Sequence, residues 1–451
     1  MNVKGRISDK GIAVNVNGKE YYIDYPEKVW KKYPDKLKAI LLDNISYLTT
    51  MHLPLMFGKK EINYETAKPF FESFFYKMMI NNIPFASDAD SVSSIEKIKH
   101  YMNTEYHFMD KNIKVPEHKE YRQKYNEQAT VNFSFGKDSL LSYAVCREIG
   151  LNPILVYVND EDTAIENEYK AKSMKKFYKE FKTKVNRIDS SVQLLHDFKY
   201  FKIPRTEWGY GHLITEFSLE ILPFAHYNKT KYIVFGNEKS CNDTYYNNDN
   251  IKSFPVYDQT HEWMKQMELM AKTMTNNKVH VMSVLEPINE IAVVKILHTR
   301  YKEIGKYQMS CFPDDNPSGK ENAWCQCCSK CARIFVLMKA NNIDPKTVGF
   351  TKNMFDREFM HAFPIFQRSE AMVGYDKAGT GKEEQKFAFY LAYKNRAKGY
   401  LIDKFKELYL EEMREKADEL HKKFFSVYDS ITMPKEIKEK VVSIYKEELK
   451  T

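Results

Sequence analysis

Residues 134–139, with the sequence SFGKDS, are of types that bind phosphate groups. Gly136 lets the backbone approach a ligand closely, the free N–H groups at the start of a following helix attract anions, and Lys137 adds a positive charge. Asp138 would repel a phosphate, which leaves it two roles, capping the helix or holding Mg²⁺ beside the phosphates. We predict a nucleotide-phosphate site here, in preference to an ordinary strand-to-helix turn with an Asp cap.

The cysteines form a second group of chemically capable residues. Five of the seven lie between Cys311 and Cys331, and in a reducing compartment such clustering favours metal binding over disulfides. Cys325, Cys328 and Cys331 have two successive C-x-x-C spacings, and Cys311 supplies a fourth thiolate. Four thiolates complete a tetrahedral Zn²⁺ site, which is structural because no position is open for water, whereas a [4Fe–4S] cluster is the alternative. Cys327 is left over or substitutes for a neighbour.

The segment 134–139 must be positioned by the elements on either side of it. A strand pattern leads into it and a helical pattern leaves it, and this alternation continues along the chain, which predicts an α/β fold with a doubly wound parallel sheet. The expected strands are 131–135, 153–158, 185–188, 231–235 and 284–289, and the expected helices are 139–149, 165–181 and 211–227. In such a sheet, ligands bind beyond the carboxyl ends of the strands.

Several polar residues stand at those strand ends. Asn159 is suited to contact adenine or ribose, although a solvated loop start explains it equally well. At another strand end, Gly236 opens space and the polar Asn237 follows it. In the segment 208–212, two close glycines predict a backbone that approaches another group, for which the nucleotide is a candidate. His212 is either a base or a hydrogen-bonded cap.

Three further positions carry weaker signals. Asp258 either contacts the acceptor substrate or caps the helix that follows it. Glu290 is expected to be solvated or ion-paired on its helix. The glycines in 374–382 do not complete the spacing of a P-loop, so that interpretation is rejected.

The regions outside the alternating pattern contain no catalytic motif. Residues 12–23 have the pattern of a β-hairpin with an Asn-Gly turn, and the region 1–128 is predicted to be an α+β appendage. The chain then divides into a nucleotide-binding domain at 129–305, a four-cysteine zinc lobe at 306–337, and a helical extension at 338–451.

Composition limits the classes of partner. The 451 residues suffice for two or three domains, and 69 basic against 61 acidic residues give a net charge of +8 spread over a mixed surface. Nucleic acid is therefore not an expected partner. No apolar run has the length of a membrane span and no signal-peptide pattern is present, so the expected location is the cytoplasm.

The segment 134–139 resembles the SGGxDS pyrophosphate loop of the PP-loop ATP pyrophosphatases, with Phe135 in place of the first glycine. The resemblance implies a Rossmann-like fold of the HUP class. It also implies a reaction in which ATP is cleaved between its α and β phosphates. A carbonyl or carboxylate oxygen is adenylated, and an amine, ammonia or sulfur then displaces AMP.

The order of this loop, Glu286-Pro287 and the cysteines resembles the 7-cyano-7-deazaguanine synthases over about residues 129–337. The resemblance implies that 7-carboxy-7-deazaguanine is adenylated with ATP and Mg²⁺ and converted by ammonia to an amide and then a nitrile. The predicted catalytic residues are Lys137, Asp138 and Ser139. The predicted ATP contacts are Ser134, Phe135, Gly136, Lys137, Asp138, Ser139, Asn159, Gly236 and Asn237, and the zinc ligands are Cys311, Cys325, Cys328 and Cys331.

The two added terminal regions make the chain similar in plan to enlarged relatives that accompany bacterial antiviral defence genes. There the activated carboxylate would be joined to an amine of an acceptor protein, and a homodimer is an open alternative to a monomer. Two other functions fit the same loop. One is a tRNA sulfur transferase with Cys241 and Cys327 as reactive thiols, and the other is a scaffold that binds ATP without cleaving it.

Overall fold

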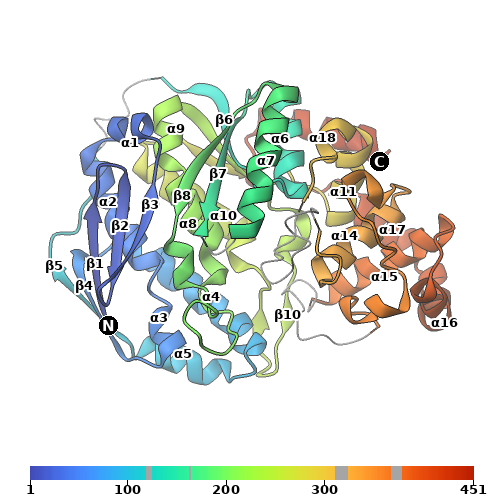
Figure 1. The fold of residues 1–451 in the computed structure, drawn as a ribbon, viewed down its shortest axis with the longest axis horizontal. Helices are drawn as coiled ribbons and strands as arrows, with labels where there is room; N and C mark the ends of the chain where they lie inside the picture. Colours follow the sequence, from blue (N-terminus) through green and yellow to red (C-terminus); the bar gives the residue numbers. More distant parts are fainter. Residues whose placement is uncertain (118–123, 162–163, 310–323, 367–377, 451) are drawn as a thin grey trace.

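One ten-stranded sheet runs through the molecule, in the order β12-β9-β6-β7-β8-β3-β2-β1-β4-β5 (Figure 1). The computed structural model describes residues 1–117, 124–161, 164–309, 324–366 and 378–450. The strands of the sheet are β1 (Asn2–Ile7), β2 (Gly11–Val16), β3 (Lys19–Asp24), β4 (Glu61–Ala67), β5 (Glu105–Asp110), β6 (Asn126–Asn132), β7 (Ile154–Asp160), β8 (Val185–Ser190), β9 (Thr230–Phe235) and β12 (His280–Ser283). The short strands β10 (Tyr245–Tyr246) and β11 (Lys252–Ser253) pair separately.

The five strands from β12 to β8 are all parallel, with β6 in the middle. The chain runs from β6 outward to β7 and β8, then returns to the other side of β6 for β9 and β12. This is the doubly wound order, in which the direction of winding reverses between β6 and β9. The connecting helices are α6 (Lys137–Glu148), α7 (Ala164–Phe181), α8 (Leu213–Glu220), α9 (Leu222–Asn228) and α10 (His261–Met274). The prediction of an α/β fold with a large, mostly parallel sheet is confirmed.

Both faces of the sheet are buried, since successive side chains along a strand point to opposite faces. On β7, Leu155 and Tyr157 belong to one hydrophobic cluster and Val156 and Val158 to another. The first cluster includes residues of α6 and α7, and the second includes residues of α8, α9 and α10. Helices therefore cover both faces, and the carboxyl ends of the strands are left as the edge where a ligand can bind.

The N-terminal region continues the same sheet, because β3 pairs antiparallel with β8. The hairpin predicted at 12–23 forms between β2 and β3, and its turn residues Asn17 and Gly18 have φ of 50° and 93°, as an Asn-Gly turn of this kind requires. The helices of this region are α1 (Glu27–Lys32), α2 (Asp35–Leu48), α3 (Leu53–Phe57), α4 (Glu72–Ala89) and α5 (Ser94–Met102).

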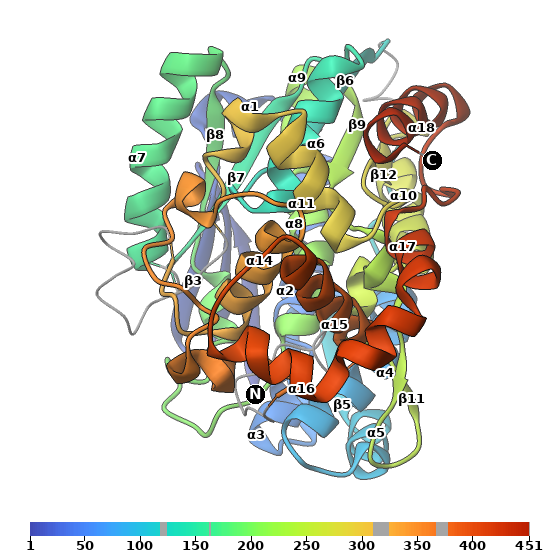
Figure 2. The ribbon, with the colours of Figure 1, turned by 90° about the vertical axis from the view of Figure 1, so that its right-hand side faces the viewer.

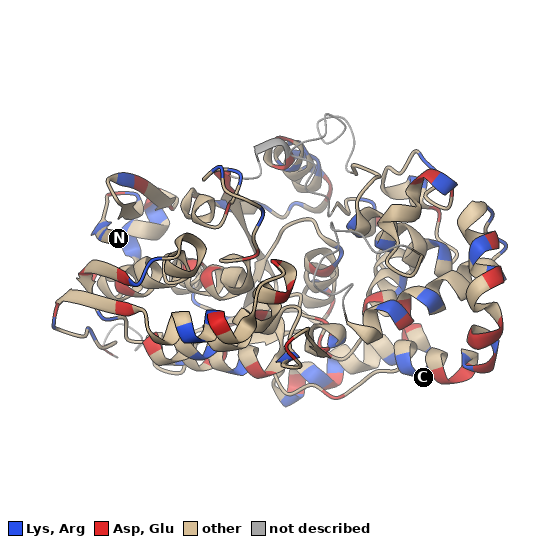
Figure 3. Ribbon diagram, turned by 90° about the horizontal axis from the view of Figure 1, so that it is seen from below, with Lys and Arg blue, Asp and Glu red and all other residues tan. Residues whose placement is uncertain are grey.

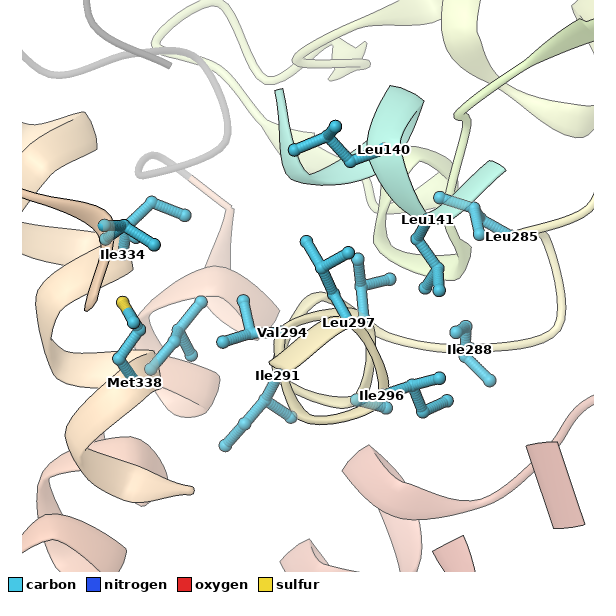
Figure 4. Packing of buried hydrophobic residues seen from close by; sticks show 14 of the residues in the cluster. Leu140, Leu141, Leu285, Ile288, Ile291, Val294, Ile296, Leu297, Ile334 and Met338 are labelled. Carbon is cyan, nitrogen blue, oxygen red and sulfur yellow. The ribbon is translucent and has the colours of Figure 1, made fainter. Parts of the chain in front are cut away.

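The C-terminal helices gather at the opposite end of the molecule from the N-terminal strands (Figures 1 and 2). Together with the helices that precede them, they are α11 (Glu290–Thr299), α12 (Lys302–Gly305), α14 (Ser329–Ala340), α15 (Gly379–Lys394), α16 (Tyr400–Glu415), α17 (Ala417–Phe425) and α18 (Lys435–Leu449). Figure 4 shows α11 between Leu140 and Leu141 of α6 and Ile334 and Met338 of α14. One hydrophobic cluster thus joins the sheet, α11 and the C-terminal helices.

Three predicted element bounds are wrong. Strand β6 ends at Asn132, so the turn begins before residue 135. The last parallel strand is 280–283, because the chain turns at Ser283, whose hydroxyl accepts a hydrogen bond from the N–H of Leu285. The helix expected at 211–227 is divided into α8 and α9, with Pro223 in the first turn of α9.

Charged residues of both signs are interspersed along the helices, as the similar numbers of basic and acidic residues predict (Figure 3). Within the described ranges, no helix combines the length and the apolar character needed to cross a bilayer.

Candidate functional site

A cleft of about 490 Å³ lies where the winding of the sheet reverses, between the carboxyl ends of β6 and β9. Its volume is within the range of small-ligand sites. Residues of α6, α7, α11 and α14 complete its walls. Seven of the predicted site residues line it, namely Ser134, Gly136, Lys137, Asp138, Ser139, Gly236 and Asn237.

Phe135 adopts the backbone conformation that a glycine favours. Its φ is 62°, in the left-handed region that side chains with a Cβ rarely occupy. Its ring is fully buried against the rings of Phe133 and Phe177, and its carbonyl accepts a hydrogen bond of 2.9 Å from the N–H of Met309. The turn therefore keeps a glycine-like backbone, and the phenyl ring anchors it in the core instead of lining the cleft.

Ser139 closes the turn. Its hydroxyl accepts a hydrogen bond from the N–H of Ser134 and donates one to the carbonyl of Gly136, both at 3.1 Å. Gly136 occupies the N-cap position of α6 and has no side chain with which to cap it. Asp138 therefore does not take the capping role that the sequence left open for it, and α6 begins beside the cleft without an N-cap side chain.

Gly236 allows the end of β9 to approach the first turn of α6. A Cβ built at Gly236 would lie 2.5 Å from the Cβ of Asp138 and 3.0 Å from its carbonyl carbon. Neither atom can move without shifting the helix. The space that this glycine leaves is thus filled by the first turn of α6. Because the two elements lie so close together, Asn237 and Glu238 line the cleft beside the 134–139 turn.

The ammonium group of Lys137 is buried among three carboxylates. Its Nζ lies 2.7 Å from Asp138, 3.3 Å from Glu290 and 3.7 Å from Glu238. Burial alone would lower the pKa of Lys137, but the three carboxylates outweigh that effect and raise the pKa well above its usual value. Lys137 therefore carries a positive charge across the working pH range of most proteins.

Glu238 and Glu290 were not predicted as site residues. Burial would raise the pKa of Glu290, but the nearby Lys137 and Arg333 hold it below its usual value, so Glu290 is an ion-paired carboxylate and not a solvated one. Burial raises the pKa of Glu238 well above its usual value. Its Oε2 is buried and has no hydrogen-bond partner among the described residues. Only its position beside Gly236 and Asn237 could have signalled this role.

Two further cationic side chains, Lys170 and Lys330, line the cleft together with Arg333. Lys170 forms an ion pair with Glu166, and both side chains are buried. Lys330 and Arg333 lie in the first turns of α14. The cleft is thus lined by ion pairs of Lys137, Lys170 and Arg333 with carboxylates. Phe235 of β9 and Ile214 of α8 are apolar residues of its lining.

Some predicted residues lie elsewhere. Asn159 does not line the cleft, because its amide donates a hydrogen bond of 2.8 Å to Asp189 on the neighbouring strand β8. Asp258 is buried and accepts a hydrogen bond of 2.9 Å from the N–H of Ile214 in α8, while Thr260 caps α10. Burial raises the pKa of Asp258 to about 7. Asp258 thus binds Ile214, which lines the cleft, without lining the cleft itself.

The cysteine cluster lies at the start of α14, with Cys325 and Cys328 before the helix and Cys331 in its first turn. The sulfur atoms of Cys325, Cys328 and Cys331 lie within 4.8 Å of one another, and Cys325 and Cys331 are separated by 3.6 Å. These three residues could hold a metal ion, as their spacing predicts. Cys327 is exposed and its sulfur is not part of the group. Cys311, the predicted fourth ligand, lies outside the described residues.

Comparison of the chain with models of known protein families gives no match, and comparison with curated protein sequences gives none either.

Proposed function

We propose that this chain is an ATP-dependent carbon–nitrogen ligase of the PP-loop type. The observation that carries the proposal is the 134–139 turn, which has a glycine-like backbone and leads into an uncapped helix N-terminus at the point where the sheet reverses its winding. A helix N-terminus at that point favours a phosphate group. The cleft beside it, with a volume of about 490 Å³, is within the size range of small-ligand sites.

In this proposal, a carboxylate oxygen of the second substrate attacks the α-phosphorus of ATP, and the bond to the β-phosphate oxygen breaks. Pyrophosphate leaves and an acyl-adenylate forms. A nitrogen nucleophile then attacks the acyl carbon, AMP leaves with the bonding electron pair, and the nitrogen loses a proton. Lys137 and the first N–H groups of α6 stabilise the departing pyrophosphate.

The carboxylates of Asp138 and Glu238 are suited to Mg²⁺. Magnesium prefers carboxylate oxygens together with substrate phosphates, and the buried Oε2 of Glu238 has no hydrogen-bond partner in the described part of the chain. When bound, Mg²⁺ would neutralise phosphate charge. The expected second substrate is 7-carboxy-7-deazaguanine, as the family resemblance implies, and the nucleophile is ammonia or an amine of an acceptor protein.

Zn²⁺ suits the cysteine cluster, because structural zinc sites are commonly formed by cysteine thiolates. Cys328 is the N-cap residue of α14 and Cys331 lies in its first turn, on the helix that carries Lys330 and Arg333 to the cleft. A metal held there would fix the start of α14. We infer that its role is to position these two cations, without taking part in bond making.

The cleft counts against a sulfur transferase. Burial, together with the charges of Glu238 and Asp138, raises the pKa of Cys241 well above its usual value. A thiol is nucleophilic only as the thiolate, so Cys241 is a poor sulfur carrier. Cys327, the other thiol that such a mechanism would use, is exposed and is not among the residues that line the cleft.

The test compares Ser139→Ala with Ser142→Ala, one turn further along α6. Ser139 closes the turn, whereas Ser142 is buried outside the cleft and its hydroxyl has no hydrogen-bond partner in the described part of the chain. With ATP, Mg²⁺ and 7-carboxy-7-deazaguanine, we expect Ser139→Ala to lower pyrophosphate release about 10²-fold and Ser142→Ala to retain it.

Mass spectrometry of the products, with ammonia or an acceptor protein as nucleophile, identifies the bond that is formed. Undiminished turnover of Ser139→Ala would reject the site. ATP binding without AMP formation across a panel of carboxylates would establish the scaffold function instead.

A further inference from the structure

Three histidines from separate parts of the chain meet in the interior, away from the cleft. His52 precedes α3, His196 follows the short 3₁₀ helix Val192–Leu195, and His212 precedes α8. All three residues are fully buried. The cluster joins the N-terminal region to the segments that follow β8.

The three rings are arranged as metal ligands would be. Their centres are separated by 5.0 Å for His52 and His196, 5.2 Å for His52 and His212, and 4.8 Å for His196 and His212. One ring nitrogen of each lies within 4.8 Å of the others. Tetrahedral Zn²⁺ bound at about 2.1 Å from each nitrogen would place imidazole centres about 5 Å apart. The observed triangle therefore has the size of a three-histidine zinc site.

The ring nitrogens lack the hydrogen bonds that buried histidines usually make. Nε2 of His52 lies 3.1 Å from the carbonyl oxygen of Leu195, but Nδ1 of His52 and both nitrogens of His196 and His212 have no hydrogen-bond partner among the described residues. A buried polar group without a partner is destabilising, because its hydrogen bonds with water are lost and not replaced. Burial lowers the pKa of all three imidazoles, that of His52 to about 4, so they are in the neutral form that binds metals.

A carboxylate stands beside the triangle. Oε2 of Glu216 lies 3.7 Å from Nε2 of His196, and Oε1 accepts a hydrogen bond of 2.6 Å from the amide of Gln193. Such an outer hydrogen bond orients a metal-binding carboxylate. Glu216 and the neighbouring Glu220 are both fully buried. A dication next to them would offset the charge of Glu216.

We propose that His52, His196 and His212 bind a structural Zn²⁺ ion, with the carboxylate of Glu216 beside His196. Three imidazoles supply three of the four ligands of a tetrahedral site, and the carboxylate of Glu216, 3.7 Å from His196, is the nearest candidate for the fourth. The contact of the carbonyl of Leu195 with His52 would direct the other ring nitrogen, Nδ1, to the metal. The ion would connect the N-terminal region to the segments that follow β8.

The histidine cluster also explains a glycine of the segment 208–212. A Cβ at Gly209 would lie 2.8 Å from Nε2 of His52 and 2.9 Å from the ring of His196, and the φ of Gly209 is 97°. Gly211 approaches a different group, the amide of Asn82. The group that these glycines approach is therefore the histidine cluster and its surroundings, and not the cleft.

The test measures zinc per chain in untagged protein, so that no histidine tag contributes. We expect about two zinc ions in the wild type, one at the cysteine cluster and one at the histidines, and about one in His196→Ala or in Cys328→Ser. The matched control is His298→Ala, since His298 is buried but hydrogen-bonded to Gln308 at 2.6 Å. It should retain the zinc content of the wild type.

X-ray absorption at the zinc edge provides a readout that needs no histidine variant. Zinc in Cys328→Ser should have only nitrogen and oxygen neighbours at about 2.0–2.1 Å, and zinc in the wild type should have such neighbours in addition to sulfur. Wild-type zinc with sulfur neighbours alone, or an undiminished zinc content in folded His196→Ala, would overturn the proposal. Zinc bound only by nitrogen and oxygen in the wild type would uphold it even if the cysteine cluster holds none, which separates it from the proposed function.

Discussion

Replacing Phe135 tests whether the 134–139 turn requires a glycine-like backbone. Phe135 and Phe133 are both fully buried, and their rings pack together with centres 4.8 Å apart. They differ in backbone conformation, since Phe135 has a φ of 62° and Phe133 is not among the described residues with positive φ. Each position can be changed to alanine and to glycine, which makes Phe133 the matched control.

The expected magnitudes follow from two terms. Removing a buried phenyl ring costs about 3–5 kcal/mol at either position. At Phe135, glycine avoids the left-handed strain that alanine retains, and it should be more stable than alanine by about 1 kcal/mol. At Phe133 the order is reversed, because glycine in ordinary backbone is less stable than alanine by about 0.5–1 kcal/mol. The difference between the two positions is therefore about 1.5–2 kcal/mol.

Urea denaturation followed by far-ultraviolet circular dichroism measures the four variants. The comparison uses midpoints at a shared denaturant slope, so that only differences in the free energy of unfolding enter. We expect Phe135→Gly to unfold at higher urea than Phe135→Ala, and Phe133→Gly at lower urea than Phe133→Ala. The same order at both positions would refute the argument that the turn is held in a glycine-type conformation.

Three further perturbations probe the parts that support the site. Glu286 accepts hydrogen bonds from residues 430–432, so Glu286→Gln should lower stability by about 1–3 kcal/mol. Hydrogen exchange should then speed up at 430–432, and unchanged exchange would contradict this. Burial alone would raise the pKa of Glu268, but hydrogen bonds with a histidine and two lysines lower it to about 2. The stabilisation by ionised Glu268 is present above the unfolded-state pKa and is lost as the pH falls toward 2. Glu268→Gln should therefore be less stable than the wild type by about 1–2 kcal/mol at pH 7, allowing for solvent screening. The difference in unfolding free energy between the two proteins should disappear in acid. Gly236→Ala should lower pyrophosphate release at least about tenfold, whereas Gly379→Ala, where a Cβ would meet open space, should leave it unchanged.

The C-terminal region is fixed to the sheet by the turn that follows β12. Glu286 accepts hydrogen bonds from the N–H and hydroxyl of Thr432 at 3.1 and 2.6 Å, and the hydroxyl of Tyr445 donates one of 3.0 Å to the carbonyl of Val284. The predicted strand at 284–289 is therefore a docking point for the last helices. Its apolar residues Val284, Leu285 and Ile288 are buried in the hydrophobic cluster that includes the C-terminal helices, and they are not part of a strand.

The features that the sequence alone determined lie within short, contiguous stretches. The types and spacing of residues 134–139, the C-x-x-C spacings from Cys325 to Cys331, and the Asn-Gly turn of the first hairpin all depend on neighbours within a few residues. Strand ends could be assigned to one edge of a parallel sheet for the same reason, because alternation of strand and helix is a local pattern.

The tertiary structure decided which side chains share a space. Lys137 meets Glu238 and Glu290, about 100 and 150 residues further along the chain. Apart from the position of Glu238 at a predicted strand end, their own segments do not mark these charged residues as buried. Asn159 was predicted to contact the nucleotide from the carboxyl end of its strand. Its side chain instead donates a hydrogen bond to Asp189 on the neighbouring strand. Burial, charge and pKa are set by packing between distant segments, and so the composition of the site follows from the fold and not from any one motif.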